Sequence, residues 1–226
     1  MSNFLSRLAS EVISNRLKCF LPNIISENQS AFMSSCLSTD NVLVAFETMH
    51  HLNQKRSGKI REMVLKLDMS KTFDRVEWGC LRDIMQKMGF DSKWITFMMQ
   101  CVISVIYSIR LNGKPHGYIT PTRGLTQGDP ISLFLFLFCA DGLSSLLQQA
   151  ISAGTLRGLA ANPQGPRISH LFFANNSIIF CQATREECNR LEQILETYEQ
   201  ASSQKSIVRR PLYFSVETPH KISRKR

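Results

Sequence analysis

The chain has 226 residues, of which 43% are hydrophobic and 20% charged, so it suits one folded domain, or one plus part of another, and is not expected to be disordered. Its formal net charge of +9 favours a polyanionic partner such as nucleic acid, with a merely basic surface as the alternative. The seven cysteines form no Cys-x-x-Cys pair, which argues against a zinc site and is typical of reduced cysteines in an intracellular protein. No signal peptide is visible, and the longest apolar run, at residues 131–140, is too short to span a membrane.

The first third of the chain is predicted to be mainly helical. Apolar residues at helical spacing predict a helix at residues 4–20, which Pro22 and Asn23 are expected to close. A polar loop at 28–39 separates it from a second helix at 41–53.

A buried strand is predicted next, at residues 59–68, because the stretch is rich in Val, Leu and Ile. Residues 74–77, Asp-Arg-Val-Glu, have the spacing of a capping box and predict the start of a helix that Gly89 ends. Asp91 is expected to cap a further helix through about Val102.

The middle of the chain predicts a hairpin followed by a loop and a long helix. Asn112-Gly113 is a good signal for a tight turn between strands at 105–111 and 117–120. A loop rich in Gly and Pro, at residues 121–130, leads into the long helix, which contains the apolar run.

The last quarter predicts a second hairpin, a helix and a strand. Two short apolar strands at 168–183 surround an Asn-Asn turn at 175–176. Residues 184–187 cap an amphipathic helix, a strand follows near 212–216, and a basic tail occupies 220–226. Because no βαβ repeat dominates, we predict an α+β fold with an antiparallel sheet backed by helices.

Several motifs occur in a fixed order along the chain. They are Leu-Asp-Met-Ser-Lys-Thr-Phe-Asp at 67–74, Gly-Leu-Thr-Gln-Gly-Asp-Pro at 124–130 and Phe-Ala-Asn-Asn at 173–176, together with Asn-Gln-Ser-Ala-Phe at 28–32 and Thr-Asp-Asn-Val-Leu-Val-Ala-Phe-Glu at 39–47. With these motifs the chain resembles the reverse transcriptase of plant LINE-class (non-LTR) retroelements. The resemblance covers residues 4–219. It implies a polymerase palm at about 60–219, partial fingers at about 1–60, and no thumb.

The resemblance also assigns catalytic and metal-binding roles. Asp68 matches the first catalytic aspartate, a ligand of both metal ions, and the backbone carbonyl of Met69 is a further metal ligand. Asn175 and Asn176 stand where the family has its other two catalytic aspartates. Asp74 could be mistaken for a metal ligand, but its capping-box spacing favours a structural role.

Other residues match nucleotide-binding positions of the family. Phe73 matches the aromatic gate that packs under the sugar, although a core aromatic is the alternative. Gln127 and Gly128 match residues that lie against the incoming nucleotide and the template base. Lys205 matches a lysine near the triphosphate. The implied partners are an RNA template, a DNA primer and a dNTP, and the implied cofactor is Mg²⁺ or Mn²⁺.

Replacing both aspartates by asparagine has a predictable consequence. Asparagine is nearly isosteric with aspartate but uncharged, so Asp68 is left as the sole matched anionic ligand for two metal ions that need shared carboxylates. We therefore expect weak metal binding and impaired catalysis. A non-catalytic nucleic-acid-binding module and a relic without a selected role are the alternative readings.

Further departures from the family pattern favour a decayed copy of an element. The family usually has Val-Pro-Gly-Arg where this chain has Met-Ser-Ser-Cys at 33–36, which removes a basic residue from the fingers. These four changes, and those at 175 and 176, can each arise from one C-to-T or G-to-A change. Thr126, where the family has Arg, cannot arise in this way, so the pattern is a bias.

Overall fold

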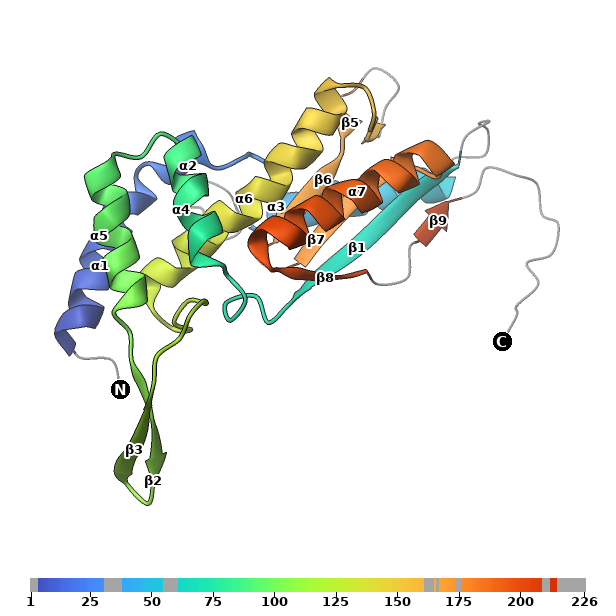
Figure 1. Cartoon of the computed structure of the whole chain (residues 1–226). Helices are drawn as coiled ribbons and strands as arrows, with labels where there is room; N and C mark the ends of the chain where they lie inside the picture. The colour runs from blue at the N-terminus through green and yellow to red at the C-terminus, as the bar shows by residue number, and fades with distance from the viewer. Residues whose placement is uncertain are drawn as a thin grey trace.

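The computed structural model describes residues 4–30, 38–54, 61–160, 165, 167–173, 176–208 and 212–214. Its helices are α1 (Phe4–Lys18), α2 (Leu21–Ile24), α3 (Ser38–Gln54), α4 (Trp78–Lys87), α5 (Ser92–Ile103), α6 (Pro130–Ser152) and α7 (Arg185–Ser202). Its strands are β1 (Glu62–Ser70), β2 (Tyr107–Leu111), β3 (Lys114–Ile119), β4 (Leu159–Ala160), β5 (Arg167–Ile168), β6 (His170–Phe173), β7 (Asn176–Gln182), β8 (Lys205–Val208) and β9 (Leu212–Phe214). Figure 1 shows a sheet at one end of the molecule, a helical layer at the other, and α6 running between them.

The main sheet is antiparallel, with strand order β6-β7-β1-β8 and with β9 pairing with the start of β1. β1 lies at its centre, because it pairs with β7 along one edge and with β8 and β9 along the other, and its alternate residues Met63, Leu65 and Leu67 are buried on one face. Fully burying a leucine such as Leu67 contributes about 1.5–3 kcal/mol, which favours this register over one shifted by a residue. The predicted α+β fold with an antiparallel sheet backed by helices is confirmed.

Helices cover the two faces of the sheet to different extents. On one face, α6 and α7 pack over the whole length of β1, through residues such as Leu147 and Leu195. On the other face, α3 packs on one end of the sheet, where Ala45 and Leu52 meet Val64. This second face is therefore covered at the start of β1, and its other end carries the candidate site.

The helical layer forms around the first half of α6. Buried residues of α1, α4 and α5 pack there against Phe134 and Phe138 of α6. α6 is long and apolar enough to span a membrane by length and composition alone, but 72% of its most apolar 18-residue window is buried. The apolar run within it therefore forms the core of this domain.

Several predicted helix boundaries are confirmed. Asp91 accepts a hydrogen bond from the backbone N–H of Lys93 at 2.8 Å and caps α5. The backbone N–H of Glu187 donates to Thr184 Oγ1 at 3.3 Å, so the predicted cap of α7 is also present. Gly89, with a φ of +85°, ends α4 as expected.

The predicted capping box at residues 74–77 is wrong. α4 begins only at Trp78, and its N-cap residue Glu77 makes no side-chain cap hydrogen bond. Asp74 is exposed in a turn, and the following Val76 is buried and accepts a hydrogen bond from the N–H of Gly124 at 2.8 Å. This tertiary contact holds the segment extended, so it does not form the first turn of a helix.

The predicted end of the first helix is also wrong. α1 ends at Lys18, and Pro22 and Asn23 lie inside the short helix α2 instead of closing α1. Proline is tolerated there because the first turn of a helix makes no use of its missing N–H.

The hairpin β2–β3 projects from the helical end of the molecule (Figure 1). Its turn residues Asn112 and Gly113 have φ values of +48° and +83°, as a tight hairpin turn requires. All residues of both strands are exposed. The predicted hairpin is thus confirmed, but it does not join the main sheet.

Candidate functional site

The two motifs that carry the predicted catalytic residues meet on neighbouring strands. Asp68, near the end of β1, is directly opposite Asn176, the first residue of β7. Paired residues of adjacent antiparallel strands point to the same face of the sheet and lie about 4.5–5.5 Å apart. Asp68 therefore lies close to Asn176, whereas Asn175 lies outside the described residues.

Two lysines lie on the same face as Asp68. Lys66 precedes it by two residues, and its Nζ is 3.4 Å from Asp68 Oδ1. Lys205 of β8 pairs with Ser70, so the same alternation brings it to this face. We call the surface formed by Lys66, Asp68, Ser70, Asn176 and Lys205 the open face.

The charge of the open face is the reverse of what a metal centre requires. It has one carboxylate and two ammonium groups, and the Asp68 side chain is only 18% exposed beside Lys66. The described residues contain no group of three or more His, Cys, Asp or Glu side chains that could hold a metal ion. These residues therefore do not fit a pair of divalent cations, which need several anionic oxygen ligands.

The Met69 carbonyl, predicted as a metal ligand, already accepts a hydrogen bond. Thr72 Oγ1 donates to it at 3.1 Å, and Thr72 is buried. One of the two lone pairs of this carbonyl oxygen is thus engaged by the protein. The described donor set therefore offers even less to a cation than the sequence alone indicates.

The turn after β1 is fixed to the loop that precedes α6. The N–H of Leu125 donates to the carbonyl of Phe73 at 2.9 Å, and Trp78 Nε1 donates to the carbonyl of Gly124 at 2.8 Å. Gly124 has a φ of +92°, and a Cβ there would lie 3.0 Å from the carbonyl oxygen of Asp74. Glycine is needed at this position because the two backbones approach each other so closely.

The three predicted nucleotide-binding residues near this loop differ in burial. Phe73 is partly buried, and its ring centroid is 5.4 Å from that of Phe136 in α6. Gln127 and Gly128 are exposed just before Asp129, the N-cap residue of α6. The structure thus places Phe73 against the core and the other two at the surface, and their roles toward a nucleotide stay predictions.

A buried histidine, which the motifs do not single out, supports the hairpin of Asn176. His170 of β6 is fully buried, with Nε2 2.8 Å from Ser144 Oγ and Nδ1 2.8 Å from Ser169 Oγ. Asn28 Nδ2 lies 3.2 Å from the same Nε2. Burial lowers the pKa of His170 to about 4, so the ring is neutral near pH 7 and joins β6 to α6. A histidine within an apolar strand is the sequence signal that could have predicted this role.

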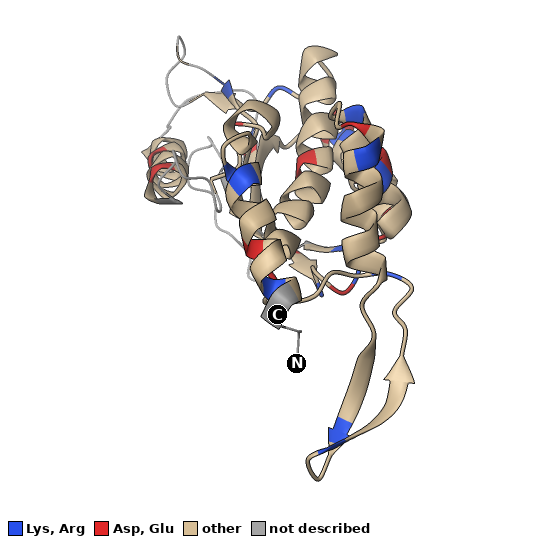
Figure 2. Ribbon diagram, turned by 90° about the vertical axis from the view of Figure 1, so that its left-hand side faces the viewer, with Lys and Arg blue, Asp and Glu red and all other residues tan. Residues whose placement is uncertain are grey.

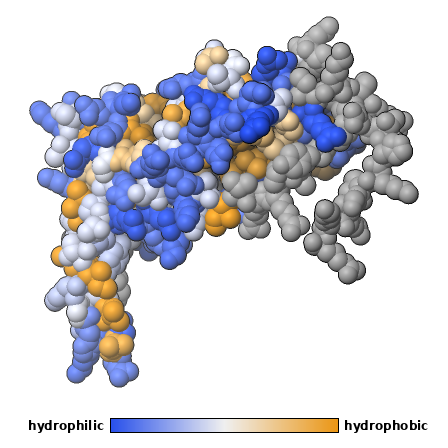
Figure 3. Space-filling model, turned by 45° about the vertical axis from the view of Figure 1, so that its right-hand side comes forward, coloured by the Kyte–Doolittle hydropathy of each residue, from blue (hydrophilic) through white to orange (hydrophobic). Residues whose placement is uncertain are grey.

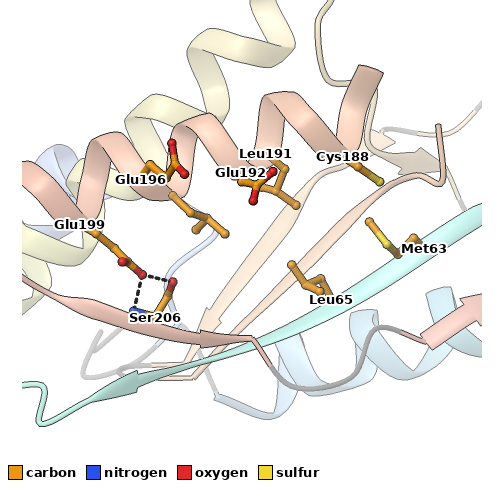
Figure 4. A pocket seen from close by; sticks show the side chains of 9 residues that line it. Met63, Leu65, Cys188, Leu191, Glu192, Glu196, Glu199 and Ser206 are labelled. Atoms are coloured by element: carbon orange, nitrogen blue, oxygen red, sulfur yellow. Dashed lines mark hydrogen bonds between the residues drawn. The ribbon is translucent and has the colours of Figure 1, made fainter. Parts of the chain in front are cut away.

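A cavity of about 380 Å³ lies on the other face of β1, between this strand, α7 and β8 (Figure 4). Met63 and Leu65 form part of its apolar lining, and Glu192 and Glu196 line it from α7. Glu199 accepts a hydrogen bond from the backbone N–H of Ser206 at 2.7 Å, which joins α7 to β8. The cavity is therefore separated from the open face by the sheet and contains none of the predicted site residues.

Besides Asn175, two further predicted features have no described position. The Met-Ser-Ser-Cys segment at 33–36 and the basic tail at 220–226 lie outside the described residues.

Comparisons with known sequences identify the family. The family model described as "Reverse transcriptase (RNA-dependent DNA polymerase)" matches residues 1–208. An uncharacterized mitochondrial protein of Arabidopsis thaliana is 46% identical over 67 residues, which are 30% of this chain and 55% of that protein. An uncharacterized 149 kDa protein of transposon TX1 from Xenopus laevis is 25% identical over 87% of this chain and 14% of its own length. A Pol polyprotein from the type-1 retrotransposable element R2 of Popillia japonica is 24% identical over 68% of this chain and 21% of its own length.

Solved structures agree on the fold. Telomerase from Candida tropicalis, truncated from its C-terminal domain, superposes with a TM-score of 0.58 at 9% identity, over 95% of this chain and 42% of that chain. Telomerase from Candida albicans gives a TM-score of 0.56 at 13% identity, over 91% of this chain and 35% of that chain. The chain thus spans about half or less of the length of these relatives. The predicted resemblance to a non-LTR reverse transcriptase is confirmed.

Proposed function

Because the chain belongs to the reverse transcriptase family, we propose that it is a reverse transcriptase palm that binds nucleic acid but is impaired in nucleotidyl transfer. Two of its relatives are proteins of transposon TX1 and of the type-1 retrotransposable element R2. Its proposed partners are those of the family, an RNA template, a DNA primer and a dNTP. Reverse transcriptases use divalent metal ions, and we propose that Mg²⁺ or Mn²⁺ binds weakly here.

The observation that carries the proposed impairment is the pairing of Asp68 with Asn176 beside Lys66. Carboxylates at such a centre neutralise the two cations and hold them about 3.5–4 Å apart. An amide supplies no charge, and an ammonium group 3.4 Å from the remaining carboxylate competes with any cation for it. Because removing one electrostatic group commonly costs about 10²–10³ in rate, the loss of two carboxylates makes turnover negligible.

The same charges favour the binding of nucleic acid. Lys66 and Lys205 leave the open face with an excess of positive charge, and the whole chain has a formal charge of +9. A phosphate backbone gains affinity from such lysines by releasing its condensed counterions. Binding is then salt-sensitive and largely independent of sequence.

A titration of labelled RNA–DNA hybrid, followed by fluorescence anisotropy at several salt concentrations, tests the binding. We expect affinity to fall steeply as salt rises, and the Lys66→Gln/Lys205→Gln variant to reduce the salt slope by about 1–2, since each phosphate contact contributes about 1 and Lys66 also pairs with Asp68. Lys87→Gln/Lys93→Gln is the matched control, because it removes the same number of charges and both lysines are exposed, on α4 and α5, outside the open face. Affinity that does not change with salt, or an equal loss in the control, would refute the proposed surface.

Primer extension tests the proposed impairment. The native chain is expected to extend no primer with either Mg²⁺ or Mn²⁺, beside an active reverse transcriptase as a positive control. Robust extension by the native chain would overturn the reading of Asn175 and Asn176 as disabling. Restoring both aspartates is expected to give weak extension at best, because substrate positioning contributes a large share of such barriers.

A further inference from the structure

The hairpin β2–β3 is an arm that the described chain leaves without a packing partner. It projects clear of the helices in both ribbon views (Figures 1 and 2), and every residue of its two strands is exposed. Two-stranded hairpins on their own are marginally stable in water. A ligand that covers the arm would therefore stabilise it.

The exposed side chains of the arm are largely apolar and aromatic. Tyr118 is 88% exposed, and Ile109, Leu111 and Ile119 are each at least half exposed. Figure 3 shows hydrophobic surface along the arm on the side that faces the viewer. An exposed aromatic ring of this kind can stack on an unpaired base.

The charge of the arm itself has one sign, whereas Arg123 at its base lies 3.4 Å from Glu77. Residues 104–128 include Arg110, Lys114 and Arg123 but no Asp or Glu. Figure 2 shows Lys or Arg near the tip of the arm and neither Asp nor Glu along it. This stretch therefore favours an anionic ligand, and a run of cations mixed with aromatic rings is typical of single-strand binding.

The base of the arm is joined to the loop that carries two of the predicted nucleotide-binding residues. Tyr107 Oη lies 3.0 Å from Thr126 Oγ1, directly before Gln127 and Gly128. A strand bound along the arm would thus continue toward this loop. The contact makes the arm an extension of the proposed nucleic-acid surface.

We propose that the β2–β3 arm binds single-stranded nucleic acid, with Arg110 and Lys114 contacting phosphates and Tyr118 stacking on an unpaired base. This proposal rests on the proposed function, since it names a further contact surface for the same partner. A single strand is specified because a duplex hides the faces of its bases, whereas an unpaired strand offers them to a tyrosine. RNA and DNA both present phosphates and unpaired bases, so the arm binds single strands of either kind.

The test measures affinity for short labelled oligouridine and oligothymidine, and for a duplex of the same length. Tyr118→Ala is expected to weaken single-strand binding by about 5- to 150-fold, the range found for loss of one base–aromatic stack, with a smaller effect on the duplex. Tyr118→Phe is the matched control, because it keeps the ring and should keep the affinity. Arg110→Gln/Lys114→Gln should lower the salt slope by about 2. The oligouridine and oligothymidine titrations then show whether the arm discriminates RNA from DNA.

Several outcomes separate this proposal from the proposed function. If Tyr118→Ala and the charge variant bind like the native chain while Lys66→Gln/Lys205→Gln binds less tightly, the arm proposal is refuted and the open face stands. If the native chain binds no nucleic acid at all, the proposed function itself is refuted. If Tyr118→Ala instead abolishes self-association in sedimentation experiments and leaves affinity unchanged, the arm is a protein contact and the proposal fails.

Discussion

The buried His170 makes stability depend on pH in a way that can be calculated. Burial lowers its pKa in the folded protein from 6.5 to about 4. Between these values the unfolded chain binds a proton that the folded chain excludes, so acid favours unfolding. The stability that comes from the neutral ring is therefore present above pH 6.5 and is lost as pH falls toward about 4.

The expected magnitude follows from the same two values. The difference between these two pKa values corresponds to about 3 kcal/mol in full. Between about pH 7 and about pH 5 the loss is about 2 kcal/mol. The groups that face the ring are Ser144, Ser169 and Asn28, none of which ionises in this range.

Urea unfolding of the native chain and of His170→Gln, at about pH 7 and about pH 5, checks this value. The variant should be less stable near neutrality, but its loss on acidification should be smaller by about 2 kcal/mol, because glutamine does not titrate. All other ionisable groups are shared and cancel in the difference. Equal losses in both proteins would refute the reasoning. If the variant does not fold, NMR titration of the native ring replaces it, and a ring that titrates near 6.5 in the folded state refutes the account equally well.

Two further predictions concern the framework of the site. Gly124→Ala should lower the free energy of unfolding by about 1–3 kcal/mol, because a Cβ would strain a left-handed backbone and press on Asp74. Gly128→Ala is its control, with similar φ but open space around the Cβ, and an equal effect in urea unfolding would disprove the role of the contact. Leu67→Ala should cost about 2–5 kcal/mol, since Leu67 is fully buried under α6 and α7. Ile207→Ala, at a half-exposed position, should cost far less, and a comparable loss in thermal unfolding would count against the described register.

The sequence predicted the elements that carry their own signal. β1, β7 and the hairpin turn at Asn112 follow from apolar runs and turn residues, and the pairing of Asp68 with Asn176 agrees with their motif order. Lys66 could also have been placed from sequence, because residues two apart in a strand share a face. The same alternation brings the Lys66 ammonium group next to Asp68 and so changes the charge of the site.

Elements stabilised mainly by tertiary contacts were less predictable. β8 has no distinctive pattern, and its strand conformation depends on pairing with β1 and on the hydrogen bond from Ser206 to Glu199. The start of α4 was misplaced because the contact between Val76 and Gly124 overrides local capping spacing. The isolated position of the β2–β3 arm could not be predicted either, because a hairpin signal does not say what the hairpin packs against.

The central claim is that the open face, with one carboxylate paired to an ammonium group, cannot hold a pair of divalent cations. Titration of Mn²⁺ by electron paramagnetic resonance tests it most directly, on the native chain and on Asn175→Asp/Asn176→Asp. Outer-shell partners of a metal site already change affinity about 10–100-fold, so two restored ligands should tighten binding by at least that much. We predict that the native chain binds Mn²⁺ weakly and that the revertant binds it more tightly. Adding Asp68→Asn to the revertant should abolish this tighter binding. Native binding as tight as that of the revertant would contradict the account.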